Sequence, residues 1–216
     1  PSFWVVLAIF GGALSISSVE DLIYPALFVI AGFVAILSHE MGHALVGRKL
    51  GGGQQTIVLE LFGGLTSSHG MQLTRGGRAL MILAGPMMTL LLGIISLGLT
   101  WNIVAPVMTS YNLNFWDLAI SPFTAALISP KLYILSCLIM IGEWWTILNL
   151  LPIYPLDGGQ LIAQYIRSPR KVFMTGFITA ILIGLLSFQL FHGYFIPIFM
   201  ALFAYSNYRE YKNAPF

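Results

Sequence analysis

The sequence predicts an all-α, polytopic membrane protein with about six transmembrane helices and a small β-hairpin or sheet at the cytosolic membrane edge. The chain is 57% hydrophobic and only 8% charged, whereas soluble domains carry about 25% charged residues. Its mean hydropathy is +0.85. Since the apolar segments are nearly continuous, we expect a single integral-membrane domain over residues 1–216. The bilayer is its expected surrounding, and no nucleic-acid partner is expected.

Six apolar segments are candidates for spanning helices, because a span needs about 20 mostly apolar residues. They are residues 3–16, 22–47, 78–104, 131–151, 172–190 and 194–208. The first is short and interrupted by Gly11-Gly12, so it is either truncated or re-entrant. Pro25 is tolerated because it falls in the first turn of the second segment, and Pro86 predicts a kink in the third.

The loops between these segments differ sharply in charge. One set of alternate loops carries Arg48, Lys49, Arg75, Arg78, Arg167, Arg170, Lys171, Arg209 and Lys212. The other set carries Glu20, Asp21, Asp117 and only Lys131. Because basic residues favour cytoplasmic loops, we expect six spans with both termini inside. His43 and Asp157 then lie toward the same, cytosolic, face.

The segment from Gly51 to Ser68 predicts the hairpin. Residues 56–61 are β-prone, Gly63-Gly64 is a turn signal, and glycines flank the segment. We therefore expect a β-hairpin or short sheet here, between the second and third spans.

The second apolar segment ends in the pattern His39-Glu40-Met41-Gly42-His43. Residues four apart lie on one face of a helix, so both histidines can hold one zinc ion and Glu40 can take a proton from water at the metal. The alternative is that the histidines satisfy each other or a backbone carbonyl. Such polar groups are costly inside a bilayer without partners, which favours the zinc site.

A zinc site of this type needs a third protein ligand and an open position. The candidates are Glu60, His69, Glu143 and Asp157. Asp157 follows a turn that contains Pro152 and Pro155, and it opens a short helix expected at about residues 158–166. An Asp in such a turn is also a common helix N-cap, so both interpretations stay open. Glu143 either lines a water path, contacts substrate, or is a protonated carboxyl bonded to a neighbouring helix.

Four motifs follow one another along the chain. They are HEMGH at 39–43, Phe62-Gly63-Gly64, Ala84-Gly85-Pro86 and NLLPIYPLDGG at 149–159. In this order and spacing they resemble the site-2 protease family of intramembrane zinc metalloproteases. The resemblance spans about residues 39–159 and implies a three-helix catalytic core at about 22–165.

The resemblance implies that His39, His43 and Asp157 ligate one Zn²⁺ ion and that Glu40 activates water. It implies that Asn149 holds the substrate or the developing oxyanion; a helix-end hydrogen bond to the backbone is the alternative role of that amide. It further implies a gated membrane cleft that cuts a transmembrane segment of another protein near the cytosolic face.

A substrate helix must unwind before hydrolysis, because its carbonyl groups are engaged in helical hydrogen bonds. The unwound segment can pair with the predicted strand by β-augmentation. We therefore predict substrate contacts at Thr56, Ile57, Val58 and Leu59.

Two positions depart from the family pattern. Leu61 stands where the family often has proline, and Gln160 stands where a basic residue often follows the Asp-Gly-Gly. They bear on the substrate track and not on the metal chemistry. A catalytically inactive scaffold or binding homologue is the alternative function, and a metal or solute transporter is a further one. The intact HExxH and Asp-Gly argue against the first, and the absence of paired repeats argues against the second.

Overall fold

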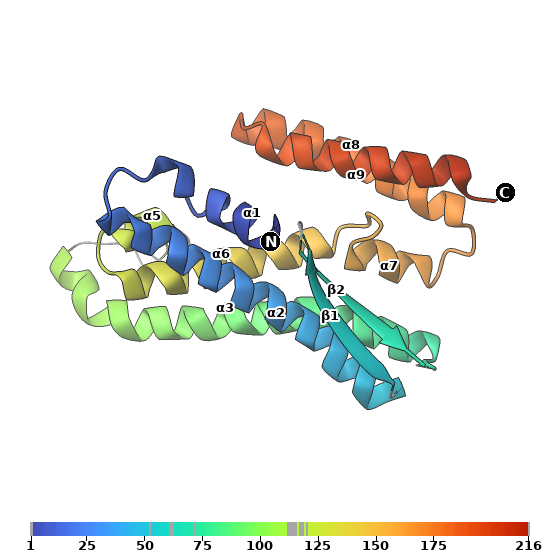
Figure 1. Cartoon of the computed structure of the whole chain (residues 1–216), viewed down its shortest axis with the longest axis horizontal. Coiled ribbons are helices and arrows are strands. Elements are labelled where there is room, and N and C mark those ends of the chain that lie inside the picture. The colour runs from blue at the N-terminus through green and yellow to red at the C-terminus, as the bar shows by residue number, and fades with distance from the viewer. Residues whose placement is uncertain are drawn as a thin grey trace. The chain divides into compact units, whose positions relative to one another are not determined.

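The structure is a computed structural model that describes residues 2–51, 53–60, 63–70, 72–111, 116, 119 and 121–215. It is mostly helical, with one small sheet (Figure 1). The chain divides into two compact units, residues 1–146 and residues 147–216. Leu61, Phe62 and Asp117, which entered the predictions above, lie outside the described residues.

The first unit contains the predicted hairpin and most of the long helices. Its elements are α1 (Ser2–Phe10), α2 (Ile23–Gly51), β1 (Gln54–Glu60), β2 (Gly63–His69), α3 (Arg75–Tyr111), α5 (Pro122–Ala126) and α6 (Pro130–Asn149), whose last three residues fall in the second unit. The second unit adds α7 (Asp157–Ala163), α8 (Pro169–Phe191) and α9 (Phe195–Asn213).

Four helices among the described residues are long and apolar enough to cross a membrane. They cover residues 20–51, 75–105, 130–149 and 169–190. The chain is therefore a multi-pass membrane protein, and four of the six predicted spans are confirmed. The nine-residue α1 extends only about 14 Å, too short to span alone. The 19-residue α9 carries Arg209, Glu210 and Lys212 near its end.

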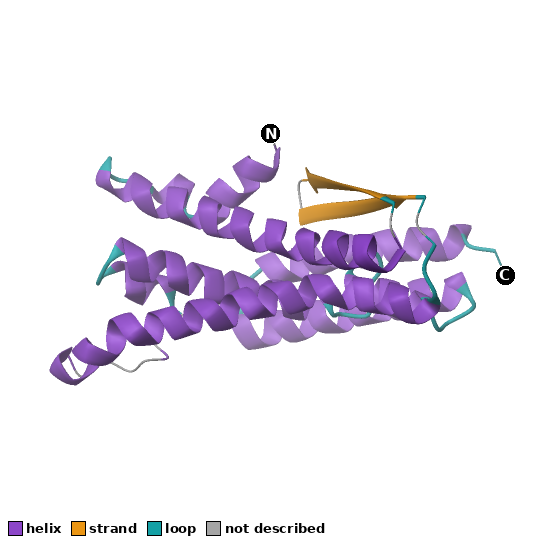
Figure 2. Cartoon of the chain, turned by 90° about the horizontal axis from the view of Figure 1, so that it is seen from below, coloured by secondary structure: helices purple, strands orange, loops and turns teal. Residues whose placement is uncertain are grey.

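The predicted hairpin is confirmed as an antiparallel pair of strands in which Ile57 faces Thr66 and Val58 faces Leu65. Side chains alternate between the two faces of a strand. Gln55, Ile57 and Leu59 are partly buried, whereas Val58 is exposed, so one face of β1 packs inward. Figure 2 shows the hairpin beside α2, which both strands contact.

Small residues allow α2, α3 and α6 to pack closely. A Cβ atom at Gly42 of α2 would collide with the backbone carbonyl of Ala84 on α3. At Gly142 of α6 a Cβ atom would lie 3.0 Å from the backbone oxygen of Thr89. Small residues at helix interfaces let backbones approach, which is how helices gain packing energy in a membrane.

A polar clasp also joins α3 to α6. The hydroxyl oxygens of Thr89 and Thr146 are 2.9 Å apart, and they lie 3.0 Å and 3.3 Å from the backbone oxygen of Pro86. Interhelical hydrogen bonds of this kind contribute only about 0.6 kcal/mol on average in membrane proteins. The clasp therefore fixes how α3 and α6 are aligned, while close packing supplies most of the stability.

The second unit is built on an antiparallel pair of helices, α8 and α9, which lie side by side. Its buried core consists of Ile153, Ala180, Met200 and Ala204. Ile153 belongs to the turn between α6 and α7, so the turn that carries the Pro-x-x-Pro sequence is anchored in the core of this unit.

Candidate metal centre

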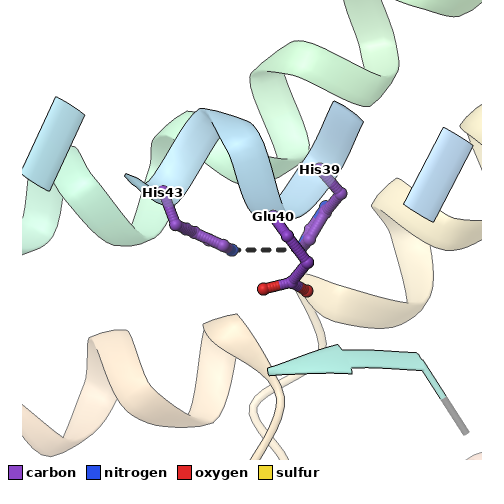
Figure 3. A group of neighbouring side chains, drawn as sticks. All are labelled: His39, Glu40 and His43. Carbon is purple, nitrogen blue, oxygen red and sulfur yellow. Dashed lines mark hydrogen bonds between the residues drawn. The ribbon is translucent and has the colours of Figure 1, made fainter. Parts of the chain in front are cut away.

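His39, Glu40 and His43 form a buried cluster on α2. Their exposed fractions are 2%, 4% and 8%, and their ligand atoms all lie within 4.8 Å of one another. Figure 3 shows both imidazoles and the carboxylate directed to the same side of the helix. The prediction that these three side chains meet is confirmed.

The two imidazoles point their Nε2 atoms at each other across 3.1 Å. His43 Nδ1 lies 2.8 Å from the backbone oxygen of Met81. A carbonyl oxygen only accepts, so Nδ1 carries the proton and the His43 Nε2 lone pair is left to bind a ligand.

This spacing fits a zinc ion. Two nitrogen ligands of tetrahedral zinc, each about 2.0–2.1 Å from the metal, are about 3.3 Å apart. The observed 3.1 Å separation needs almost no adjustment. Without metal, the same distance allows His39 Nε2 to donate to His43 Nε2, so the alternative arrangement uses the same geometry and keeps both polar atoms satisfied.

Gly85 of α3 lies directly against the two imidazoles. A Cβ atom at this position would collide with His43 Nε2 and would lie 2.9 Å from His39 Nε2. The absence of a side chain at Gly85 therefore leaves the room in which the two nitrogens converge. This gives the Ala84-Gly85-Pro86 motif a physical role.

Glu40 is held by the hairpin. The Thr66 hydroxyl of β2 donates to Glu40 Oε2 at 2.6 Å and lies 3.2 Å from the Glu40 backbone oxygen. A length of about 2.5–2.7 Å is typical of a hydroxyl bonded to a carboxylate. Gly64, on the same face of β2, approaches so closely that a Cβ atom would overlap the Glu40 side chain.

Asp157 and Asn149 belong to the second unit. Asp157 is 5% exposed and is the first residue of α7, with Leu156 at the N-cap position. The N-cap position thus falls on Leu156, one residue before Asp157. Asn149 is the buried last residue of α6. Both stay predicted site residues.

Of the other candidates for the third ligand, Glu143 is not in this cluster. Glu143 is exposed on α6, and the side chains of Glu60 and His69 lie outside the described part of the chain. Of the predicted strand residues, Thr56 and Val58 are exposed, while Ile57 and Leu59 are on the inward face. Leu59 packs beside Phe3, Leu7 and Ile36.

The sequence did not indicate that Thr66 or the backbone carbonyl of Met81 contributes to the site. The alternation of β2 shows that Thr66 shares a face with Gly64, but nothing in the sequence indicates which face covers α2. The Met81 carbonyl carries no sequence signal, because every residue has one.

We predict that Gly85→Ala weakens zinc binding at least about tenfold, because the new methyl group displaces the imidazoles that hold the ion. Gly98→Ala is the matched control, since a Cβ atom at Gly98 of the same helix would meet nothing within 4 Å. Zinc affinity is measured by chelator competition, with helix content followed by circular dichroism. Equal zinc affinity in two folded variants would contradict the assignment of Gly85.

The chain is similar to known proteases in sequence and in fold. A zinc metalloprotease of Methanocaldococcus jannaschii is 29% identical over 203 residues, which cover 89% of this chain and 51% of the relative. The chain thus spans about half the length of that curated relative. The solved structure of the site-2 protease from the same organism matches with a TM-score of 0.59 at 23% identity, covering 97% of this chain and 88% of that one. The two share a fold.

The sequence profile of peptidase family M50 matches residues 27–191. This range is most of the chain. It contains both the side-chain cluster of His39, Glu40 and His43 on α2 and the turn that leads to Asp157. The chain therefore belongs to peptidase family M50, the site-2 protease family.

Proposed function

We propose that this protein is an intramembrane zinc endopeptidase that hydrolyses peptide bonds in or near transmembrane segments of other proteins. The buried His39, Glu40 and His43 cluster inside a membrane-spanning helix is the observation that carries the proposal. Glu40 precedes the end of α2 at Gly51 by eleven residues, or about 16 Å along the helix. A hydrolytic site on such an apolar helix suits a substrate peptide bond in or near the bilayer.

In this proposal one zinc ion is held by His39 and His43, and Asp157 completes the ligand set. The buried position of Asp157 at the start of α7 and its place in the family-matched region support that role. When bound, zinc supplies a Lewis acid that polarises the scissile carbonyl and makes a water ligand more acidic.

Glu40 accepts the proton of the attacking water and returns it to the leaving amine. The hydrogen bond from Thr66 holds the Glu40 carboxylate in one orientation, which a general base needs in order to reach its proton. Asn149 supplies an amide donor to the substrate or to the developing oxyanion.

The substrate is a membrane protein whose unwound segment pairs with the outer edge of β1. Within the described residues the sheet has two strands, so this edge pairs with no further strand. The exposed side chains of Thr56 and Val58 would contact the substrate, while Ile57 and Leu59 contribute backbone groups.

The loop charges support a cytosolic orientation of the hairpin and the metal site, with six membrane segments in a single 1–216 protease domain. In this arrangement α1 and α9 supply the two segments beyond the four long spans. Side-specific labelling of a cysteine introduced at Arg167 tests the orientation: modification from the outer face would contradict it.

Glu40→Gln is expected to retain zinc and to lower cleavage at least about 100-fold, because it removes the base but no ligand. Asp157→Ala is expected to bind zinc much more weakly, through the two histidines alone, whereas Glu210→Gln, an acidic residue exposed in the same unit, should keep the affinity of the intact chain. The measurements are zinc content and a proteomic comparison of membrane-protein fragments between cells that carry the intact chain and those that carry Glu40→Gln. Bound zinc with identical fragments in both would favour the scaffold function.

Thr66→Val should lower the cleavage rate at saturating substrate about tenfold with zinc content unchanged, since a misoriented base loses part of its contribution of about 10²–10⁴. Thr66→Ser keeps the hydroxyl and should cleave nearly as fast as the intact chain. The positioning role of Thr66 would be excluded by a valine variant of normal rate, or by a serine variant as slow as the valine one.

Single proline substitutions from Thr56 to Leu59 test the strand. Successive N–H groups in an antiparallel pair alternate between the partner strand and the open edge, so we expect cleavage of a transmembrane reporter to fall in every second variant. The matching alanine substitutions, which keep the backbone N–H groups, are the controls and should cleave faster than the proline variants. Unchanged cleavage through the β1 series would rule out β-augmentation at this edge.

A further inference from the structure

A buried amide on the last helix contacts the turn that carries Asp157. Asn207 of α9 is 1% exposed. Its Nδ2 donates to the backbone oxygen of Tyr154 at 2.6 Å and to that of Phe203 at 2.9 Å. Both partners are carbonyl oxygens, so the NH₂ group and not the oxygen of the amide must face them.

The contact reaches the backbone three residues before Asp157. Within the turn, Ile153 N donates to Leu151 O at 2.7 Å and Leu156 N donates to Ile153 O at 2.8 Å. Gly159 lies so close to Tyr154 that a Cβ atom would overlap its nitrogen. The turn and the start of α7 are therefore closely packed and hydrogen-bonded, so a bond to Tyr154 O also constrains the backbone that leads to Asp157.

Helix α8 holds Asn207 in place from its other side. A Cβ atom at Gly176 would overlap Asn207 Oδ1 and would lie 3.3 Å from Tyr154 N. Gly176 thus allows α8 to press the amide against the turn. A side chain held on two sides has few alternative rotamers, so its hydrogen bond to Tyr154 is preorganised.

We propose that Asn207 is a positioning residue for Asp157, holding the backbone of the ligand-bearing turn from the C-terminal helix. This inference rests on the proposed role of Asp157 as the third zinc ligand. Groups that orient metal ligands from outside the ligand shell typically change metal affinity about 10–100-fold when they are lost. Asn207 lies on α9, beyond residue 191, where the match to the family profile ends.

The test measures zinc affinity by chelator competition in the full chain. Asn207→Leu, which keeps the branched shape but loses both donors, and the isosteric Asn207→Asp should each lower affinity about 10–100-fold. Ser187→Ala is the matched control: Ser187 is also buried in α8 and donates within its own helix to Gly184 O, but it has no part in the turn. The absorption spectrum of the cobalt(II)-loaded protein should change in the Asn207 variants and not in the control.

A double substitution separates positioning from a general loss of stability. If Asn207 acts through Asp157, adding Asn207→Leu to Asp157→Ala should cause no further loss of zinc affinity. Additive losses, or folded Asn207 variants with the affinity and cobalt spectrum of the intact chain, would overturn the inference. If Asp157→Ala itself leaves zinc affinity unchanged, the proposed ligand set fails and the inference fails with it. If Asp157→Ala weakens binding and the Asn207 variants do not, only the inference fails.

Discussion

The close approach of α2 and α3 is the constraint on which the His39, Glu40 and His43 cluster depends. At Gly42 and at Gly85 a single added carbon would collide with the opposite helix. This contact brings the Met81 carbonyl within hydrogen-bonding distance of His43 Nδ1, and that bond fixes Nε2 as the ring nitrogen with the lone pair. The metal-binding tautomer of His43 therefore depends on helix packing. If α2 and α3 were further apart, the helix interface and the hydrogen bond that fixes this tautomer would both be lost.

The hairpin stabilises the carboxylate of Glu40, which is buried in apolar surroundings. A charged group at such a site is costly unless it is hydrogen-bonded. Thr66 supplies that bond, and Gly64 allows the strand to come near enough for it. This strand, β2, pairs with β1. The hairpin that is proposed to receive substrate on β1 therefore also orients the proposed base through β2. Substrate pairing and the position of Glu40 are consequently coupled through two adjacent strands.

The parts of the site that depend on local sequence could be predicted, and those that depend on tertiary contacts could not. His39 and His43 meet because they are four residues apart on one helix, and the hairpin follows from β-prone residues beside paired glycines. Thr66 stands among Ser67 and Ser68, three hydroxyls that look alike until one face of the strand is packed. Asn207 is 53 residues from Tyr154. Its neighbours in sequence, Tyr205, Ser206 and Tyr208, form no pattern that predicts its burial. Helix α3 was predicted to end at residue 104 and continues to Tyr111, although Pro106 predicts an interruption there.

The proposed ligands are held in two different ways. A helix holds the two histidines, whereas a turn holds Asp157, and the two need different support from the rest of the chain. A helix sets the spacing of residues four apart by its own hydrogen bonds, so the histidine pair needs only room and one carbonyl partner. A turn has few hydrogen bonds of its own, and its conformation must be imposed from outside. Around the turn before Asp157 the chain supplies a buried Ile153, glycines at 158, 159 and 176, and the amide of Asn207. The α8–α9 pair, which carries none of the predicted site residues, thus contributes the rigidity that a carboxylate ligand on a turn requires.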